Sequence, residues 1–234
     1  MRASPRRMLT AFLAVVCAGL APAGPAQTWV REEAVYSSHF NEENRIALTF
    51  DDGPHPVYTP EILDLLAEYG IHATFFLIGE NAERYPELIA RIQREGHEIG
   101  NHTYDHTYLH RQSEAAVEEA ILHAENVILE LSDQRPKLLR PPGGLYDHNV
   151  CTAARTLDYE VILWTIDTLD WAHTPPEKIT ENVLTHIASG DIILCHDAVG
   201  GKPSPTPQAL AQFLPVLIER GYQFVTVSEL IHSG

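Results

Sequence analysis

The sequence predicts an α/β fold in which a parallel sheet curls into a (β/α) barrel. Two observations lead to this prediction. Short apolar runs alternate with helical patterns along most of the chain, and glycines stand where helices should end. Six or seven such units in one domain favour a barrel over the alternative, a doubly wound open sheet. No Gly-x-Gly-x-x-Gly motif follows the first apolar run, which weakens the nucleotide-binding form of that alternative.

The expected strands and helices follow from hydrophobic periodicity. Seven short runs have the composition of buried strands: Arg45–Phe50, His72–Ile78, His97–Gly100, Lys137–Arg140, Glu160–Ile166, Asp191–Cys195 and Gln223–Val227. Five segments carry a helical pattern: Thr59–Tyr69, Pro86–Arg94, Ser113–Leu131, Glu177–Ala188 and Pro207–Arg220. Four glycines are expected just past helix ends, where a left-handed residue is favoured: Gly70, Gly96, Gly190 and Gly221.

Composition and charge restrict the partners. The chain has 234 residues with a formal net charge of −16 at pH 7. Such an acidic balance argues against a nucleic-acid partner, which would require a basic surface. After the N-terminal segment, no run reaches the roughly 18 apolar residues of a membrane span. The length suits one domain, and we expect a monomer.

The first residues resemble a secretory signal rather than part of the fold. Three arginines precede an apolar run from Met8 to Leu20, and small residues and prolines follow. We expect residues 1–26 to be this signal, with cleavage after Ala23 or, preferably, Ala26. A membrane anchor is the alternative, but the run is short for one. The prediction places the protein in the periplasm or outside the cell, with residues 27–44 as an irregular leader and residues 45–234 as the domain.

Two cysteines remain after this segment, Cys151 and Cys195. In an exported protein they can form a disulfide. However, Cys195 lies in an apolar run that reads as a buried strand. We therefore favour the interpretation that both are small core residues that do not pair.

Acidic residues and histidines follow several expected strands, and catalytic groups of barrels stand at carboxyl ends of strands. Asp51 and Asp52 end the first strand, and alternation directs their side chains differently, although Asp-Gly is also a common turn. His102 and His106 follow the third strand, and a helical turn would place both imidazoles on one face. Two imidazoles and one carboxylate form a catalytic zinc set, although chance spacing among 13 histidines is the alternative.

Three later segments add further polar groups at strand ends. Arg140 precedes Pro141-Pro142-Gly143-Gly144, where a guanidinium is suited to hold a carboxylate and glycines allow close approach to a ligand. Asp170-Trp171 and Leu194-Cys195-His196 follow the next runs. Each segment alone is compatible with a plain loop. Five such segments in this order are far less compatible with plain loops, because the independent probabilities of chance matches multiply.

Together these segments resemble the five ordered motifs of the polysaccharide deacetylases, the NodB-homology domain proteins of carbohydrate esterase family 4. The resemblance covers roughly residues 45–230. It implies a distorted (β/α) barrel of 7–8 units in a single domain. It also implies an enzyme that hydrolyses N-acetyl groups of N-acetylglucosamine-containing glycans, such as peptidoglycan or chitin-type oligomers, and releases acetate.

The resemblance also implies a role for each matched residue. Asp51 corresponds to the general base and His196 to the general acid. Asp52, His102 and His106 correspond to the ligands of a divalent metal, usually Zn²⁺, with Co²⁺ or Ni²⁺ as alternatives. Support is implied for Asp51 from Arg140 and for His196 from Asp170. The substrate and oxyanion positions are Gly143, Trp171 and Leu194.

Gly143 departs from the family pattern, because many relatives carry a bulky side chain there. Because a backbone N–H needs no side chain, the resemblance still implies an oxyanion donor at Gly143, and we expect Tyr146 to fill the more open wall. The expected partner is a glycan substrate. An O-acetyl (xylan) esterase and a metal-holding, non-catalytic glycan-binding module are the alternatives. His55 and His148 lie near strand ends, and Asp167 and Asp197 are expected to support the site.

Overall fold

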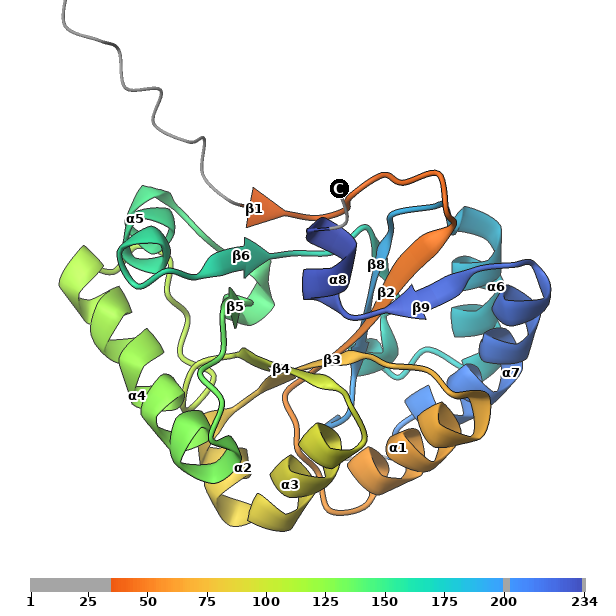
Figure 1. Cartoon of the computed structure of the whole chain (residues 1–234), viewed down its shortest axis with the longest axis horizontal. Helices are drawn as coiled ribbons and strands as arrows, with labels where there is room; N and C mark the ends of the chain where they lie inside the picture. Colours follow the sequence, from red (N-terminus) through yellow and green to blue (C-terminus); the bar gives the residue numbers. More distant parts are fainter. Residues whose placement is uncertain (1–34, 200–202, 233–234) are drawn as a thin grey trace, which may run out of the picture. The chain divides into compact units, whose positions relative to one another are not determined.

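The strands in the described part of the chain form one parallel sheet. The computed structural model describes residues 35–199 and 203–232. The sheet runs in the order β1-β6-β5-β4-β3-β2-β8-β7, and β9 also pairs with β2 (Figure 1). The strand bounds are β1 Val35–Tyr36, β2 Arg45–Asp51, β3 Thr74–Leu77, β4 Glu98–Asn101, β5 Leu138–Leu139, β6 Glu160–Ile162, β7 Ile166–Asp167, β8 Ile192–His196 and β9 Gln223–Val225.

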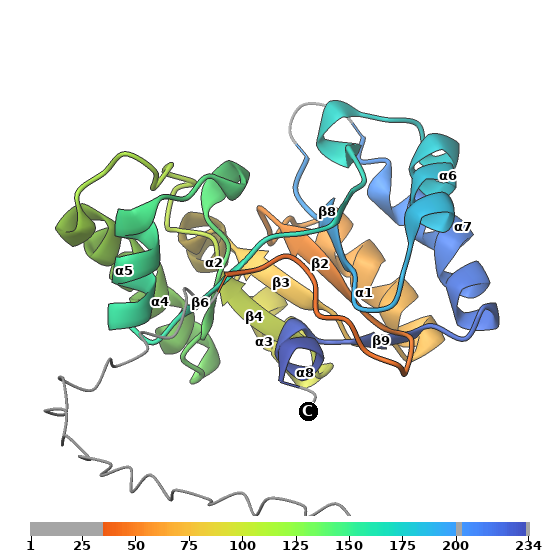
Figure 2. The same ribbon diagram turned by 90° about the horizontal axis from the view of Figure 1, so that it is seen from above.

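In the described part of the chain, the α-helices α1 to α7 pack along the outer face of this curled sheet, and α8 lies on its inner side (Figures 1 and 2). The outer helices are α1 Tyr58–Tyr69, α2 Gly79–Arg84, α3 Pro86–Arg94, α4 Glu114–Ser132, α5 His148–Thr156, α6 Pro176–His186 and α7 Thr206–Glu219. The inner helix is α8 Val227–Ile231, and two short 3₁₀ helices, η1 Pro142–Gly144 and η2 Asp170–Ala172, follow strand ends. This arrangement confirms the distorted (β/α) barrel and excludes the doubly wound alternative.

Strand β2 shows how alternation divides the core. Its side chains at positions 46, 48 and 50 are fully buried among the outer helices, in one cluster with Ile62 and Phe213. Ala47 lies in a different cluster, on the inner face. Thr49 and Asp51 follow on that same inner face, because successive strand residues point to opposite sides. The strand thus leads from an apolar interior to an acidic end.

Helix α8 closes the inner face at the start of the strands. Val227, Leu230 and Ile231 pack there with Ala47, Phe76, Leu138, Ile162 and Ile192. The helix begins at a capping box, in which the Thr226 hydroxyl accepts from the Glu229 N–H and the Glu229 carboxylate accepts from the Thr226 N–H. The interior at this end is therefore a packed apolar core rather than a channel.

Some local predictions are wrong. The run Glu160–Ile166 is two strands, β6 and β7, and helices α2, α5 and α8 were not predicted. Gly190 does not follow the end of α6, which ends at His186. Gly190 has a φ of 92°, and a Cβ there would lie 2.4 Å from the His39 carbonyl oxygen. Its role is to allow this close approach, not to cap a helix.

Other sequence predictions meet the structure differently. Cys151 and Cys195 are both buried and form no disulfide among the described residues, as favoured. The described part of the expected leader contributes β1, which pairs with β6. The expected signal at residues 1–26 lies outside the described residues. Within the described ranges, no helix is long and apolar enough to cross a membrane.

Candidate metal and catalytic site

The predicted site residues meet at one edge of the sheet. All strand pairs that flank them are parallel, so the carboxyl ends of β2, β4, β5 and β8 lie together. The last residues of β2 and β8 are Asp51 and His196, and the turns after β2, β4, β5 and β7 carry the other candidates: Asp52, His102, His106, Arg140 and Asp170. Three contact groups result: a possible metal triad, a carboxylate–guanidinium pair and a carboxylate–imidazole pair.

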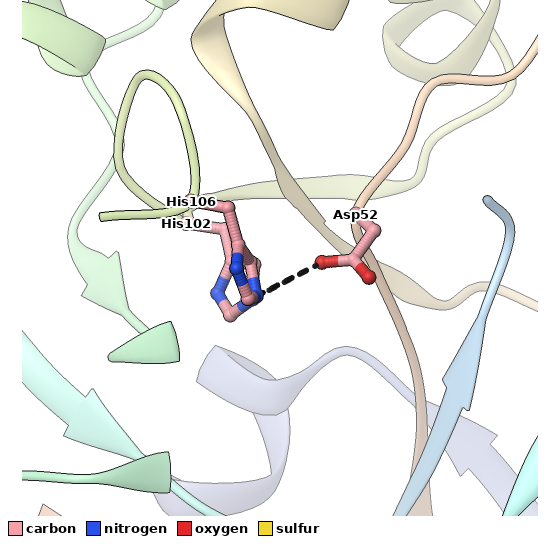
Figure 3. Close-up of side chains that lie close together, drawn as sticks. All are labelled: Asp52, His102 and His106. Atoms are coloured by element: carbon pink, nitrogen blue, oxygen red, sulfur yellow. Dashed lines mark ion pairs between the residues drawn. The ribbon is translucent and has the colours of Figure 1, made fainter. Parts of the chain in front are cut away.

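Asp52, His102 and His106 form the triad, with both imidazoles facing the carboxylate (Figure 3). Asp52 Oδ1 lies 3.4 Å from His102 Nε2 and 3.5 Å from His106 Nε2, and one ligand atom from each residue falls within 4.8 Å of the others. Asp52 Oδ1 is buried and has no hydrogen-bond partner among the described residues. A buried, unsatisfied carboxylate oxygen beside two imidazole nitrogens fits a cation between them.

A backbone contact prepares His102 for this role. Its Nδ1 lies 2.6 Å from the carbonyl oxygen of Arg140. Because a carbonyl oxygen only accepts, Nδ1 must carry the proton, which leaves the Nε2 lone pair free in the neutral ring. This is the arrangement that orients metal-binding histidines.

The segment between the two histidines is a turn, not the helical turn that the spacing suggested. Thr103 and His106 have φ values of 66° and 62°, so two left-handed residues bend the chain. Asn101 Oδ1 accepts from the Thr103 N–H at 2.8 Å, and Asn101 Nδ2 donates to the Ile121 carbonyl at 2.9 Å. The imidazoles still converge, with ring centroids 5.2 Å apart.

Arg140 holds Asp51 from inside the barrel. The guanidinium is fully buried, and its Nη1 donates to Asp51 Oδ1 and to Thr49 Oγ1, both at 2.7 Å. Nη2 donates to the Leu163 carbonyl at 3.0 Å, and the group lies 4.1 Å from the centroid of the Phe76 ring. These contacts fix the orientation of the Asp51 carboxylate.

Asp170 and His196 form the third group. Asp170 is fully buried, and its Oδ1 accepts from His196 Nδ1 at 2.7 Å. Its Oδ2 accepts from the His196 N–H and the Thr206 hydroxyl, both at 2.7 Å. Burial opposes charge on His196, but the hydrogen bond and charge of Asp170 outweigh it and raise the pKa of His196 to about 9. The imidazole is therefore protonated at neutral pH.

In the metal triad the pKa shifts run the other way: the pKa values of His106 and Asp52 are lowered, whereas that of His196 is raised. Burial lowers the pKa of His106 and outweighs the attraction of Asp52. Burial works to raise the pKa of Asp52, but His102 and the other imidazoles outweigh it, so that pKa lies below its usual value. Neutral imidazole and ionised carboxylate are the forms that bind a metal.

The expected substrate residues lie around these groups with differing exposure. Leu194 is 3% exposed within β8, whereas Trp171 is 53% exposed and Tyr146 is 42% exposed. Gly143 lies in η1 with a φ of 65°. The ring nearest to a Cβ built at Gly143 belongs to Tyr108, with Cε1 3.0 Å away. Tyr108 was not predicted, although an aromatic residue two positions after His106 was a usable signal.

The remaining candidates have mainly structural contacts. His55 Nδ1 accepts from the backbone N–H groups of Val57 and Tyr58, and its ring stacks on Tyr58. Asp167 accepts from the indole N–H of Trp171. Asp197 is fully buried, accepts from the Thr59 hydroxyl at 2.5 Å and has its pKa raised to about 7 by burial. Asp167 and Asp197 thus contact the surroundings of the site.

Comparison with known proteins agrees with this geometry. The family model for polysaccharide deacetylase matches residues 40–162. A peptidoglycan-N-acetylglucosamine deacetylase of Bacillus cereus is 46% identical over 193 residues, which covers 82% of this chain and 90% of that protein.

Solved structures give the same result. A peptidoglycan N-acetylglucosamine deacetylase bound to a naphthyl-substituted N-oxidanyl-benzamide superposes with a TM-score of 0.83 at 37% identity, covering 89% of this chain and 97% of that one. A family 4 acetyl xylan esterase from Clostridium thermocellum with a cobalt ion gives a TM-score of 0.73 at 33% identity, covering 80% and 89%. The chain belongs to the polysaccharide deacetylase family.

Proposed function

We propose that this chain is an exported, metal-dependent hydrolase that removes N-acetyl groups from N-acetylglucosamine-containing glycans and releases acetate. The observation that carries the proposal is the convergence of three groups at one sheet edge. Asp51 is held by Arg140, His196 is held by Asp170, and Asp52 faces two imidazoles. Hydrolysis of an amide needs a base, an acid and a means of polarising the carbonyl, and these groups match those needs.

Each residue has a chemical task in the proposed reaction. Asp51 takes a proton from the attacking water, and Arg140 holds that carboxylate in position. The water oxygen bonds to the acetyl carbon, and the carbon–nitrogen bond breaks. His196 donates its proton to the departing nitrogen, and Asp170 stabilises the protonated ring before that transfer. The backbone N–H of Gly143 is proposed to donate to the developing oxyanion.

Asp52, His102 and His106 would hold the metal in this proposal. A divalent metal held there would lower the pKa of a bound water and would polarise the acetyl carbonyl. Two imidazoles and one carboxylate match the three-ligand sets of catalytic zinc sites, so we propose Zn²⁺. Co²⁺ and Ni²⁺ are alternatives, and the cobalt-containing acetyl xylan esterase supports the first of these.

Peptidoglycan is the proposed substrate, ahead of chitin-type oligomers. The names of the similar protein from Bacillus cereus and of the solved structure with the bound benzamide support this choice. The basic, apolar and small-residue segments at the N-terminus support export to the periplasm or outside the cell. The acidic charge of the chain is compatible with this substrate, because a neutral sugar needs no basic surface for binding. We propose that the protein acts as a monomer.

Two alternatives remain distinct from this proposal. An O-acetyl (xylan) esterase would use the same groups, and the acetyl xylan esterase neighbour favours testing it. A metal-holding glycan-binding module without turnover would bind sugar but release no acetate. The presence of both Asp51 and His196 argues for turnover.

Metal removal tests the proposal directly. Acetate release from N-acetylglucosamine oligomers, peptidoglycan and acetylxylan is measured before chelation, after chelation and after addition of Zn²⁺. Bound metal is quantified in parallel by mass spectrometry. We expect release from the N-acetyl substrates to disappear on chelation and to return with Zn²⁺. Release from acetylxylan alone would support the esterase, and sugar binding with no release would support the binding module.

A further inference from the structure

Tyr108 is an exposed aromatic residue beside the metal triad. Tyr108 lies in the segment after β4 that also carries His102 and His106, and it is 50% exposed. The Tyr108 and His106 ring centroids lie 5.7 Å apart at an interplanar angle of 75°. The Tyr108 ring thus borders a proposed metal ligand, while half of the residue remains exposed to solvent.

The same ring occupies the space beside Gly143. A Cβ built at Gly143 would lie 3.0 Å from Tyr108 Cε1, closer than ordinary van der Waals contact. The second nearest side chain belongs to Leu145, at 3.8 Å, and Tyr146 is not among the three nearest atoms. Tyr108 therefore fills the position that we had expected Tyr146 to fill. The ring lies between the metal triad and the turn that carries the proposed oxyanion donor.

The backbone around Tyr108 is held firmly although the ring is exposed. The next residue, Leu109, is fully buried in the core beneath α4 and α5. The Tyr108 carbonyl accepts from Gln112 Nε2 at 2.5 Å, and the Arg111 N–H donates to Asp147 Oδ2 at 2.7 Å. The Tyr108 hydroxyl makes no hydrogen bond with any described residue. The ring is thus presented on a fixed support with its polar end available.

Strand order places a second exposed ring on the other side of Asp51. The turns after β4 and β5 lie on one side of β2, and those after β7 and β8 lie on the other. Trp171 follows β7, is 53% exposed and has its indole N–H held by Asp167 at 3.3 Å. Two exposed aromatic rings therefore flank the reacting groups, one on each side of the strand that carries Asp51.

We propose that Tyr108 is a substrate-positioning residue whose ring packs against a sugar ring of the glycan beside the acetamide being cleaved. An aromatic face offers apolar area to the C–H face of a pyranose, and a phenol adds a group that hydrogen-bonds to sugar hydroxyls. The proposal rests on the proposed function. It assigns to Tyr108, on the turn after β4, a contact that position 143 cannot make, because a glycine has no side chain.

The test measures sugar binding without turnover. The Asp51→Asn chain, loaded with Zn²⁺, is titrated calorimetrically with the tetramer of N-acetylglucosamine, with and without Tyr108→Ala. We expect Kd to rise about tenfold in Tyr108→Ala. Tyr108→Phe should stay within about threefold, whereas Tyr108→Leu, which keeps bulk but loses the ring, should resemble Tyr108→Ala.

Phe40→Ala is the matched control. Phe40 is 77% exposed and lies next to Gly190, near the beginning of the strands, so its loss should leave Kd unchanged. Zinc content is measured for every variant, because Tyr108 touches His106. An unchanged Kd in Tyr108→Ala, or a raised Kd accompanied by loss of zinc, would overturn the positioning role.

The kinetics of the chain with Asp51 intact separate this inference from the proposed function. Tyr108→Ala should raise KM for the tetramer about tenfold and change kcat by less than about threefold. A fall in kcat at unchanged KM would contradict positioning. If the unsubstituted chain releases no acetate from any N-acetyl glycan, the proposed function itself fails. If it does so and Tyr108→Ala behaves identically, only the role of Tyr108 fails.

Discussion

The two ends of the inner face of the sheet are built from the same strands but have opposite characters. At the beginning of the strands, Ala47 and Ile192 pack with helix α8 in an apolar core. At the carboxyl ends, the same two strands carry Asp51 and His196. A few residues along one strand thus separate a region that stabilises the fold from one that carries charge. The difference teaches that stability and chemistry can be changed separately.

Asp51→Asn should have the largest effect on activity. The amide can still accept from Arg140 but cannot take a proton, so acetate release should fall roughly 10²–10⁴-fold. Stability should also fall, because the buried guanidinium of Arg140 loses its counter-charge. The rate is therefore measured per folded molecule.

Asp191→Asn is the matched control at the other end of β8. Asp191 is nearly buried and accepts from the Ala188 N–H at 2.6 Å. Its substitution should lower stability but leave the rate per folded molecule within about threefold. If both substitutions reduced the rate equally, the separation between the two ends would not hold.

Asp170→Asn should have a smaller effect that depends on pH. The pKa of His196 is raised to about 9, so the protonated acid is present below that pH and is lost as the pH rises through it. Loss of the Asp170 charge lowers this pKa, so the alkaline fall in acetate release should begin at lower pH. We expect a loss of about tenfold at pH 8 and a smaller loss near pH 6.

The raised pKa of His196 also predicts how the stability of the fold depends on pH. A raised histidine pKa contributes stability fully below the unfolded value of 6.5 and loses that contribution as the pH rises through about 9.

Asp167→Asn serves as the control for Asp170→Asn, because Asp167 contacts Trp171 and not His196. An alkaline limb that moved equally in both variants would contradict a specific role for Asp170.

Leu230→Ala should have the smallest effect on activity. Leu230 is fully buried in the apolar core at the closed end. Its truncation should lower the free energy of unfolding by about 2–5 kcal/mol. Denaturant unfolding measures this loss, and acetate release per folded molecule should stay within about threefold. A large fall in the rate would show that packing at the closed end is transmitted to the site.

Sequence periodicity predicted the parts of the fold that rest on repetition. The alternation in β2 and the apolar spacing in α1 both reflect one buried face, and both were located to within one residue. Helix α2 was missed because Gly79–Arg84 is short and polar and has no apolar period. Strands β6 and β7 were joined because the apolar character hardly falls between Ile162 and Ile166.

The site was predictable where residue types determine the chemistry. Asp52, His102 and His106 were expected together and lie together. The turn between the histidines was not predicted, because the spacing of four residues suggested a helical turn, whereas Thr103 and His106 have left-handed φ values that non-glycine residues rarely adopt. Tyr108 could have been selected from its place two residues after His106, but its proximity to Gly143 could not, because it joins two turns that are far apart in the sequence.

The hydrogen bond from His102 to the carbonyl oxygen of Arg140 has an evolutionary consequence. A backbone carbonyl survives any substitution at position 140, and Pro141 restricts the conformation of the residue before it and so the direction of that carbonyl. The orientation of His102 is therefore buffered against side-chain mutation. The orientation of Asp51 is not, because it depends on the Arg140 side chain. As such sequences diverge, drift at this position should erode proton transfer before it erodes metal binding.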